Sequence, residues 1–366
     1  MLHNTTSAEP TSQQLQLLLS GSGSDAPDRP ALNDERLRSL IDLATAQRVI
    51  GPTAWALHDA GIKLSDDVAA LARERFQGAM AWCLELELRL LDVKRWFDEA
   101  GGIEFLVLKG AAVAHLDELD PSQRSFADLD LLIHARDMDL ALDVLQANGA
   151  VRRIPEHHRG FDRRFVKGVG LSCEDGIEVD VHRTLCVGAL GFRIPLDELF
   201  ARPDTFAIGG ENISALRLEQ RALHAAYHAV IGSPVPALHT LRDLSRYLAR
   251  PELSHNVLVP EAHRWRGETV LWSAVKATAE VFGPLPAAWH EWADSFSPDE
   301  RDLDLIVLTQ AESPWPIEWS TLRELSWSDR VAYCWEVAWP SAETLAERNQ
   351  TRWSRLRNGV QALARR

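Results

Sequence analysis

The stretch FLVLKGAAVAHLDELDPSQRSFADLDLLI, residues 105–133, decides the fold. Its apolar start, Phe105–Leu108, predicts a buried strand, and Lys109-Gly110 then opens a helix. After a proline-containing loop, a second apolar run carries Asp128 and Asp130. Because side chains two positions apart on a strand point to the same side of a sheet, these two carboxylates are expected to lie next to each other.

A third carboxylate lies on a later strand. Residues 176–182, GIEVDVH, alternate between apolar and polar side chains and begin at an Asp-Gly turn, a pattern typical of a hairpin. If this strand lies beside the one that carries Asp128, Asp180 completes a cluster of three acids. Carboxylates held this close repel one another unless a cation binds between them, and oxygen ligands suit Mg²⁺. Two such ions stabilise the attacking and the leaving oxygen of a phosphoryl displacement.

Anion binding is indicated by Lys109 and Gly110, which lie where the first strand passes into a helix. Glycine lets the backbone approach a phosphate closely, and the amide groups of a helix N-terminus attract anions together with an ammonium group. Arg124, in the loop before the second strand, is a further candidate for the same anion. The alternative interpretation is an ordinary turn with a surface charge.

These residues together resemble a known family. Leu108-Lys109-Gly110, then Arg124, then the run Asp128–Ile133 and finally Glu178–His182 are similar in type and order to the nucleotidyltransferase superfamily typified by DNA polymerase β. Within it, the chain resembles the bacterial group labelled uncharacterised nucleotidyltransferase, over roughly residues 85 to 250. The resemblance implies an α+β fold: a polymerase-β-like nucleotidyltransferase core, in which helices flank a mixed sheet, with N-terminal helices before it and a C-terminal helical domain after it.

The resemblance also implies an activity, the transfer of a nucleoside monophosphate, AMP from ATP, to a hydroxyl or amine with release of pyrophosphate. Asp128 and Asp130 would hold two Mg²⁺ ions, which Mn²⁺ can replace, and Asp180 would bind the second ion and activate the acceptor. The residues expected to bind the nucleotide are Lys109, Gly110 and Arg124.

Four further residues are candidate substrate contacts. His157 and His158 belong to a basic stretch that can contact the triphosphate or an acidic acceptor, although such charges also protect a strand edge. His182 is a candidate ligand or base, or a residue that orients Asp180. Asp243 lies where the family often has an aspartate, and it is expected to line the acceptor side of the cleft.

His224 and His228 lie four positions apart, on one side of an expected helix. This spacing is that of a zinc-binding helix, but the glutamate of a metalloprotease motif is replaced by Ala225. We therefore interpret the pair as helix histidines that face a cleft or the solvent.

The domain organisation follows from composition and periodicity. The N-terminal residues are rich in small and polar types, which predicts a mobile arm, with an apolar patch at Leu15–Leu19 that could dock on a partner or on the domain. Among the short strands expected in the core is Phe161–Val166. The expected divisions are a flexible arm (1–30), an N-terminal helical region (31–102), the nucleotidyltransferase core (103–216) and a C-terminal helical domain (217–366).

Composition excludes several classes of protein. The 366 residues carry a formal net charge of −14, which argues against a nucleic-acid binder and against docking on anionic lipid. Four cysteines without a C-x-x-C pair give no zinc module or disulfide framework, so a cytoplasmic location is expected. No apolar run reaches the roughly 18 residues of a membrane span. The expected partners are a nucleoside triphosphate and a small-molecule, peptide or protein acceptor, and the sequence does not indicate the oligomeric state.

Two other functions stay open at this point. The first is a catalytically silent nucleotide-binding or partner-binding module of a biosynthetic system, because Gly110-Ala111 stands where the superfamily more often has Gly-Ser or Gly-Gly. The second is a metal site formed by His157, Asp180 and His182 that performs oxygenase or hydrolase chemistry.

Overall fold

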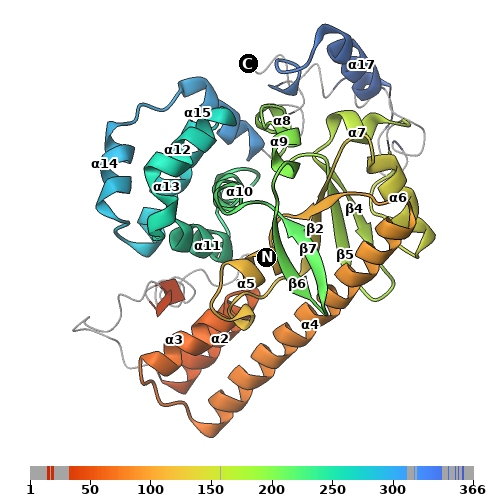
Figure 1. Ribbon diagram of the computed structural model, residues 1–366. Helices are drawn as coiled ribbons and strands as arrows, with labels where there is room; N and C mark the ends of the chain where they lie inside the picture. The colour runs from red at the N-terminus through yellow and green to blue at the C-terminus, as the bar shows by residue number, and fades with distance from the viewer. Residues whose placement is uncertain are drawn as a thin grey trace.

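In the computed structural model, helices flank a seven-stranded sheet (Figure 1). The structure describes residues 33–156, 158–310 and 320–339, together with residues 15, 16, 18, 19, 317, 345, 351, 353 and 357. None of the helices in this part of the chain is both long enough and apolar enough to cross a membrane.

The sheet is mixed. Its strands lie in the order β3-β4-β5-β2-β1-β7-β6. Strand β2 runs parallel to β5, β1 runs parallel to β7, and the other neighbours are antiparallel. The fold is therefore of the α+β class expected from the sequence. The strands are β1 (Phe105–Val107), β2 (Asp128–Ile133), β3 (Val151–Arg152), β4 (Gly168–Ser172), β5 (Glu178–His182), β6 (Asp204–Ile208) and β7 (Glu211–Ala215).

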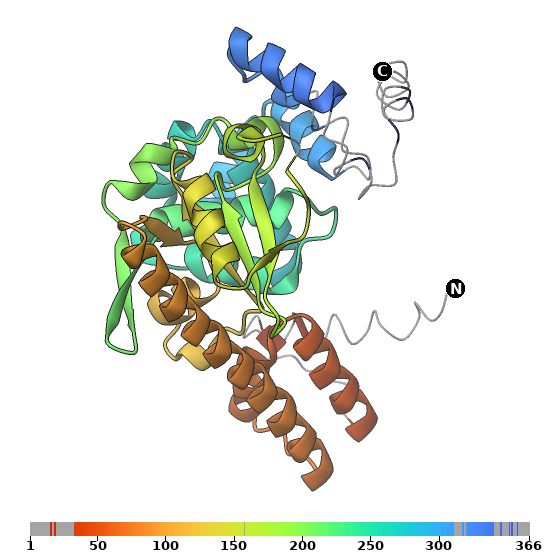
Figure 2. The same ribbon diagram turned by 90° about the vertical axis from the view of Figure 1, so that its right-hand side faces the viewer.

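The long helix α4 connects the N-terminal helices to the sheet. Its first half packs against α2 and α3, and its second half lies against the sheet and α6 (Figure 2). Two aspartates in its first turn are favourable there because they lie at the positive end of the helix dipole. The helices up to the end of the core are α2 (Asp34–Ala46), α3 (Ile50–Asp59), α4 (Asp66–Glu99), α5 (Ala111–Leu116), the 3-10 turn η1 (Pro121–Gln123), α6 (Met138–Ala147), α7 (Phe161–Phe165), α8 (Gly188–Gly191) and α9 (Leu196–Phe200).

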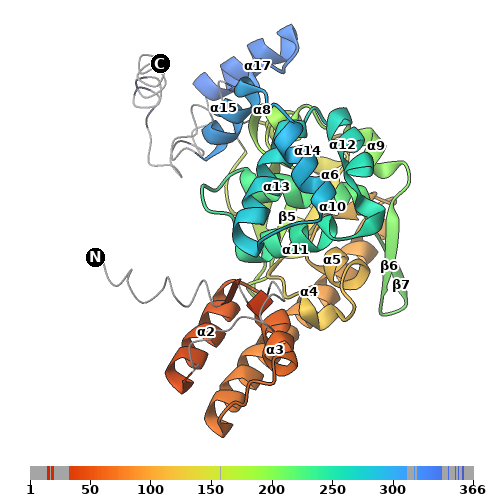
Figure 3. The same ribbon diagram turned by 90° about the vertical axis from the view of Figure 1, so that its left-hand side faces the viewer.

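The C-terminal helices gather around α10, which contacts α11, α12 and α13 (Figure 3). One continuous hydrophobic cluster contains side chains from α2, from the sheet and from α10 to α15, so the N-terminal helices, the sheet and these helices share a core. The helices after the sheet are α10 (Leu218–Val230), α11 (Leu238–Leu248), η2 (Pro251–Leu253), α12 (His255–Arg264), α13 (Glu268–Phe282), α14 (Ala287–Ser295), α15 (Glu300–Thr309) and α17 (Trp327–Ala338).

Alternation along β2 gives the sheet two different faces. Leu129 and Leu131 pack into the cluster that includes α4 and α6. Leu132 points the other way and packs into the cluster that includes the C-terminal helices. Asp128 and Asp130 lie on the same side of the strand as Leu132, so the two carboxylates face the C-terminal helices.

The structure corrects one sequence-based expectation and decides between the alternatives left open for another. Phe161–Phe165 forms the short helix α7 and not a strand. Its two phenylalanines are four positions apart, and as one helical turn both rings contact Tyr333 of α17. Within the expected mobile arm, Leu15 is fully buried in the core cluster, so the apolar patch docks on the protein itself at this residue.

Candidate active site

The acidic cluster forms because β2 and β5 pair in parallel. Their register places Asp130 opposite Asp180 and Asp128 opposite Glu178. All four acids therefore lie on the face of the sheet that points toward the C-terminal helices. Ligand atoms of Asp130, Asp180 and His182 lie within 4.8 Å of one another, which is close enough for a single metal ion to contact all three side chains. The structure thus places Asp180 beside Asp130, as the sequence predicted, while Asp128 lies on the same face but outside this group of three side chains.

Lys109 supplies a positive charge to the two aspartates of β2. The amide of Leu108, the residue before Lys109, donates to the carbonyl of Asp130 at 3.0 Å. This hydrogen bond fixes the position of the Lys109 backbone relative to β2. The Lys109 Nζ atom lies 3.1 Å from Asp130 Oδ2 and 4.0 Å from Asp128 Oδ2. The ammonium group therefore lies between the two carboxylates of β2.

Gly110 is required by the turn that follows β1. Its φ is +59°, a conformation that side chains disfavour, and a Cβ atom there would meet the Phe126 ring and its Cβ at 3.2 Å. The turn consequently brings the start of α5 against the segment that leads into Asp128. The close contact at Gly110 is with Phe126, and the expected approach of its backbone to a phosphate stays a prediction.

The two aspartates of β2 have opposite electrostatic environments. Burial and then the charge of Asp130 raise the pKa of Asp128. Burial also opposes the charge of Asp130, but the Lys109 ammonium and a hydrogen bond from His182 outweigh it and hold the pKa of Asp130 below its usual range. Asp130 is therefore ionised and compensated, whereas Asp128 carries a charge that the protein compensates poorly.

His182 orients Asp130 and not Asp180. Its Nε2 atom lies 2.8 Å from Asp130 Oδ1, and the side chain is buried. Its Nδ1 atom is buried without a hydrogen-bond partner among the described residues. Because burial lowers the pKa of His182, the ring is best described as a neutral donor to the carboxylate.

Two arginines near the cluster were not identified from the sequence. Arg153 pairs with Glu178 at 2.9 Å and also with Asp180. The absence of a side chain at Gly170 on β4 makes room for it, since a Cβ there would meet the guanidinium at 2.1 Å. Arg48, from the turn between α2 and α3, has its Nη1 atom 3.9 Å from Asp128 Oδ1. In the sequence, the only hint of the Arg153 contact was Gly170, whose missing side chain leaves room for the guanidinium.

Lys167 is a further cation that the sequence did not connect with the acids. Its charge interacts with Asp130 and Asp180, and burial lowers its pKa. It belongs to the basic stretch for which only His157 and His158 had been considered as site residues.

Arg124 and Asp243 were both expected to contact substrates, and the structure pairs them with each other instead. Arg124 Nε lies 3.1 and 2.9 Å from the two carboxylate oxygens of Asp243, and both side chains are buried. The guanidinium also donates to the backbone carbonyl of Ser125. The pair therefore ties the segment before β2 to helix α11, and its charges are satisfied within the protein.

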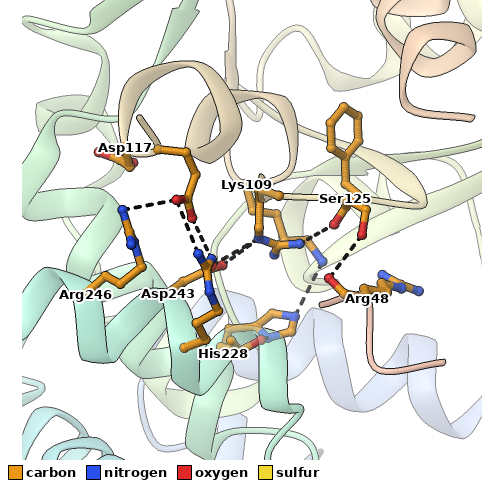
Figure 4. Close-up of polar contacts among 12 residues, drawn as sticks. Arg48, Lys109, Asp117, Ser125, His228, Asp243 and Arg246 are labelled. Atoms are coloured by element: carbon orange, nitrogen blue, oxygen red, sulfur yellow. Dashed lines mark hydrogen bonds and ion pairs between the residues drawn. The ribbon is translucent and has the colours of Figure 1, made fainter. Parts of the chain in front are cut away.

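His228 of α10 contacts Lys109 directly. Its Nε2 atom lies 3.4 Å from Lys109 Nζ, and its Nδ1 atom lies 3.1 Å from Thr240 Oγ1 (Figure 4). Since an ammonium group only donates, Nε2 accepts and the proton of the neutral ring is on Nδ1. His224 has Nδ1 3.3 Å from the carbonyl of Leu108 and is buried. The histidine pair therefore faces the Lys109 turn, and not the solvent.

Two candidates from the sequence remain, His157 and His158. His157 is outside the described residues. His158 pairs with Glu336 of α17. Its ring does not belong to the group formed by Asp130, Asp180 and His182. The structure thus does not bring His158 to the acidic cluster.

Comparison with known proteins identifies the family. Residues 33–283, more than half of the chain, match the family described as uncharacterised nucleotidyltransferase. No curated protein matches the chain in sequence. Among solved structures, the chain is similar to an antigenic nucleotidyltransferase-like protein from Paracoccidioides brasiliensis, with 17% identity and a TM-score of 0.34 over 56% of this chain and 97% of that chain. Because the matched residues include the whole sheet and every side chain of the acidic cluster, the chain belongs to the uncharacterised nucleotidyltransferase family.

Proposed function

We propose that the protein transfers a nucleoside monophosphate, AMP from ATP, to a hydroxyl or amine of a small molecule, peptide or protein, with Mg²⁺ as the cation and pyrophosphate as the leaving group. Membership of a nucleotidyltransferase family supports nucleotidyl transfer. The observation that supports metal-dependent chemistry is the parallel register of β2 and β5, in which Asp130 and Asp180 are direct partners beside Asp128.

The residues of the cluster fit a divalent cation. His182 already bonds Asp130 through Nε2, so its role is to orient that carboxylate and not to bind the ion. The ligands are then Asp128, Asp130 and Asp180, and an oxygen-only set favours Mg²⁺ or Mn²⁺ over zinc. Burial and then the charge of Asp130 raise the pKa of Asp128, and a bound cation would offset both effects. When bound, the cations supply positive charge that offsets the charge of the transferring phosphoryl group.

Asp180 is the carboxylate that takes the proton of the acceptor. Its side chain is 28% exposed, against 22% for Asp128 and 4% for Asp130, so Asp180 is the most accessible of the three to an acceptor. As the acceptor oxygen or nitrogen bonds to the α-phosphorus, the bond from that phosphorus to the oxygen shared with the β-phosphate breaks. Pyrophosphate leaves, and the acceptor proton passes to Asp180.

Lys109 and the backbone at Gly110 steady the triphosphate. The Lys109 ammonium lies between Asp128 and Asp130, where it can exchange Asp130 for phosphate oxygens. Arg124 is not part of this set, because Asp243 occupies its guanidinium. The net charge of −14 disfavours a nucleic acid as the acceptor and leaves small molecules, peptides and proteins.

The test is a transfer assay with purified protein, Mg²⁺ and each of the four α-labelled ribonucleoside triphosphates, in the presence of fractionated small molecules, peptides and proteins. We expect a labelled product with ATP that disappears with EDTA and in the Asp128→Asn/Asp130→Asn variant. Asp143→Asn, an exposed substitution of the same type on α6, serves as the control that keeps the activity.

The other outcomes separate the alternatives. Nucleotide binding without any labelled product across the acceptors would favour a silent nucleotide-binding module. Stoichiometric iron or zinc in the purified protein would favour hydrolase or oxygenase chemistry at Asp180 and His182.

A further inference from the structure

Arg48 reaches the acidic cluster from a distant part of the sequence. It lies in the turn between α2 and α3, eighty positions before Asp128, and its Nη1 atom is 3.9 Å from Asp128 Oδ1. Lys109 approaches the other oxygen of the same carboxylate, at 4.0 Å. Cations from two separate elements therefore flank Asp128.

The backbone of Arg48 is held in a conformation that normally belongs to glycine. Its φ is +58°, and the amides of Arg48 and Val49 bond to the carbonyls of Thr45 and Ala44 at 3.0 and 2.8 Å. This is the Schellman arrangement at the end of a helix, in which the left-handed residue is most often glycine. Because glycine would adopt this turn with less strain, the arginine side chain is present at a cost to the backbone.

Contacts with the core fix this turn in place. Ser125 Oγ donates to the carbonyl of Arg48 at 3.0 Å (Figure 4), three residues before Asp128. A Cβ atom at Gly51 would lie 2.2 Å from the carbonyl oxygen of Ser122, so the start of α3 meets the backbone of η1 directly. Backbone contacts of this turn with the core thus fix where the Arg48 side chain begins relative to Asp128.

The guanidinium of Arg48 keeps its donors available. The Arg48 side chain is 40% exposed, and among the described residues its ion pair is the 3.9 Å contact with Asp128, which is longer than a hydrogen bond. The neighbouring arginines are committed, Arg124 to Asp243 and Arg153 to Glu178 and Asp180. Arg48 is therefore the arginine at this cluster that can offer a planar pair of donors to a phosphate.

We propose that Arg48 binds the phosphates of the nucleotide together with Lys109, so that the N-terminal helices contribute a residue to the active site. This inference rests on the proposed function. It assigns α2 and α3 a part in substrate binding, in addition to their contact with α4.

The test uses Arg48→Gly, because glycine suits the left-handed turn and preserves its backbone hydrogen bonds. Arg266→Gly is the matched control: Arg266 is the other described non-glycine residue with positive φ (+52°), it ends α12 in the same way, and its ion pair is with Glu324. Binding of α,β-methylene-ATP with Mg²⁺ is measured by titration calorimetry, and Tm by thermal unfolding. Lys109→Met and Arg48→Lys complete the set.

We expect Arg48→Gly to weaken binding about tenfold, while its Tm is equal to or higher than that of the wild type. Arg266→Gly should keep wild-type affinity, and Arg48→Lys should fall between wild type and Arg48→Gly because it keeps the charge but loses the fork of donors. If Arg48→Gly binds like the wild type while Lys109→Met is weakened, the inference is wrong and the proposed function stands. If the wild type itself does not bind the analogue, both are wrong.

Discussion

Asp130 of β2 and Asp180 of β5 are direct partners across two parallel strands. Their spacing is set by the hydrogen bonds of the sheet, and a shift of one residue would turn either side chain to the opposite face, among the apolar contacts of α4 and α6. Lys109 and His182 then compensate the charge of Asp130 from two sides. The sheet thus positions the acids, and neighbouring side chains determine how much charge each can carry.

Asp128→Asn is expected to stabilise the metal-free protein while abolishing transfer. The raised pKa of Asp128 means that its ionised form is unfavourable in the fold, so removing the charge should raise Tm in EDTA by about 2 °C. The same change removes a proposed metal ligand, and transfer should fall on the order of 10³-fold. Thermal unfolding in EDTA and the transfer assay measure the two effects. A lower Tm than that of the Asp143→Asn control would contradict the electrostatic account.

Stability is expected to fall as the pH is lowered from 7.5 to 5. Burial lowers the pKa of His224 from 6.5 to about 3, so between these values the unfolded chain binds a proton that the folded protein does not. Stability is therefore lost as the pH falls through this window, by about 2 kcal/mol at pH 5 for His224 alone.

Urea unfolding at both pH values measures this effect in the wild type, in His224→Gln and in His58→Gln, an exposed control on α3. The His224→Gln variant should lose about 2 kcal/mol less than the wild type on acidification. Equal losses in all three proteins would show that His224 is not the group responsible.

The Arg124–Asp243 pair is expected to be structural. Arg124→Met should destabilise the protein by about 3 to 5 kcal/mol, because it leaves the Asp243 carboxylate buried without its partner. The double variant Arg124→Met/Asp243→Leu should recover most of this loss and should bind α,β-methylene-ATP as the wild type does. Urea unfolding and calorimetry provide the comparison. Weak binding by a stable double variant would instead restore Arg124 as a nucleotide contact.

His228 is expected to position Lys109. His228→Leu removes the acceptor at 3.4 Å from Lys109 Nζ and should raise the KM for ATP about five- to tenfold, with a smaller change in kcat. His228→Gln retains an acceptor at the same reach and should restore most of the affinity. Steady-state kinetics of the two variants measure this difference. If His228 had a purely structural role, the two variants would have the same KM for ATP.

The sequence was sufficient for the central strands. The apolar run at residues 128–133 and the alternation at residues 178–182 indicated both strands, and their two-residue spacing indicated that Asp128 and Asp130 share one side. That the two strands are adjacent came from the family resemblance, because local periodicity carries no information about which strands pair. Short segments were harder. In FDRRFV, phenylalanines four positions apart fit a helical turn, and the contact with Tyr333 that favours it is distant in sequence.

Long-range contacts explain the remaining differences. Arg124 and Asp243 are 119 positions apart, so each could only be interpreted alone, and each alone suggested a substrate contact. Arg48 gave no local signal, because its importance depends on a turn that packs against Ser125. His158 was assigned to a substrate, but a partner on α17 accounts for its position. Charged side chains can be recognised in a sequence, whereas their partners are determined by the tertiary fold.

The most direct test of nucleotidyl transfer compares ATP labelled at the α-phosphate with ATP labelled at the γ-phosphate, in the presence of Mg²⁺ and the acceptor fractions. The account predicts that the α-label is found on the acceptor and the γ-label in pyrophosphate, and that both signals are lost in Asp130→Asn. A γ-label on the acceptor, or no transfer of either label by a protein that binds ATP, would contradict it.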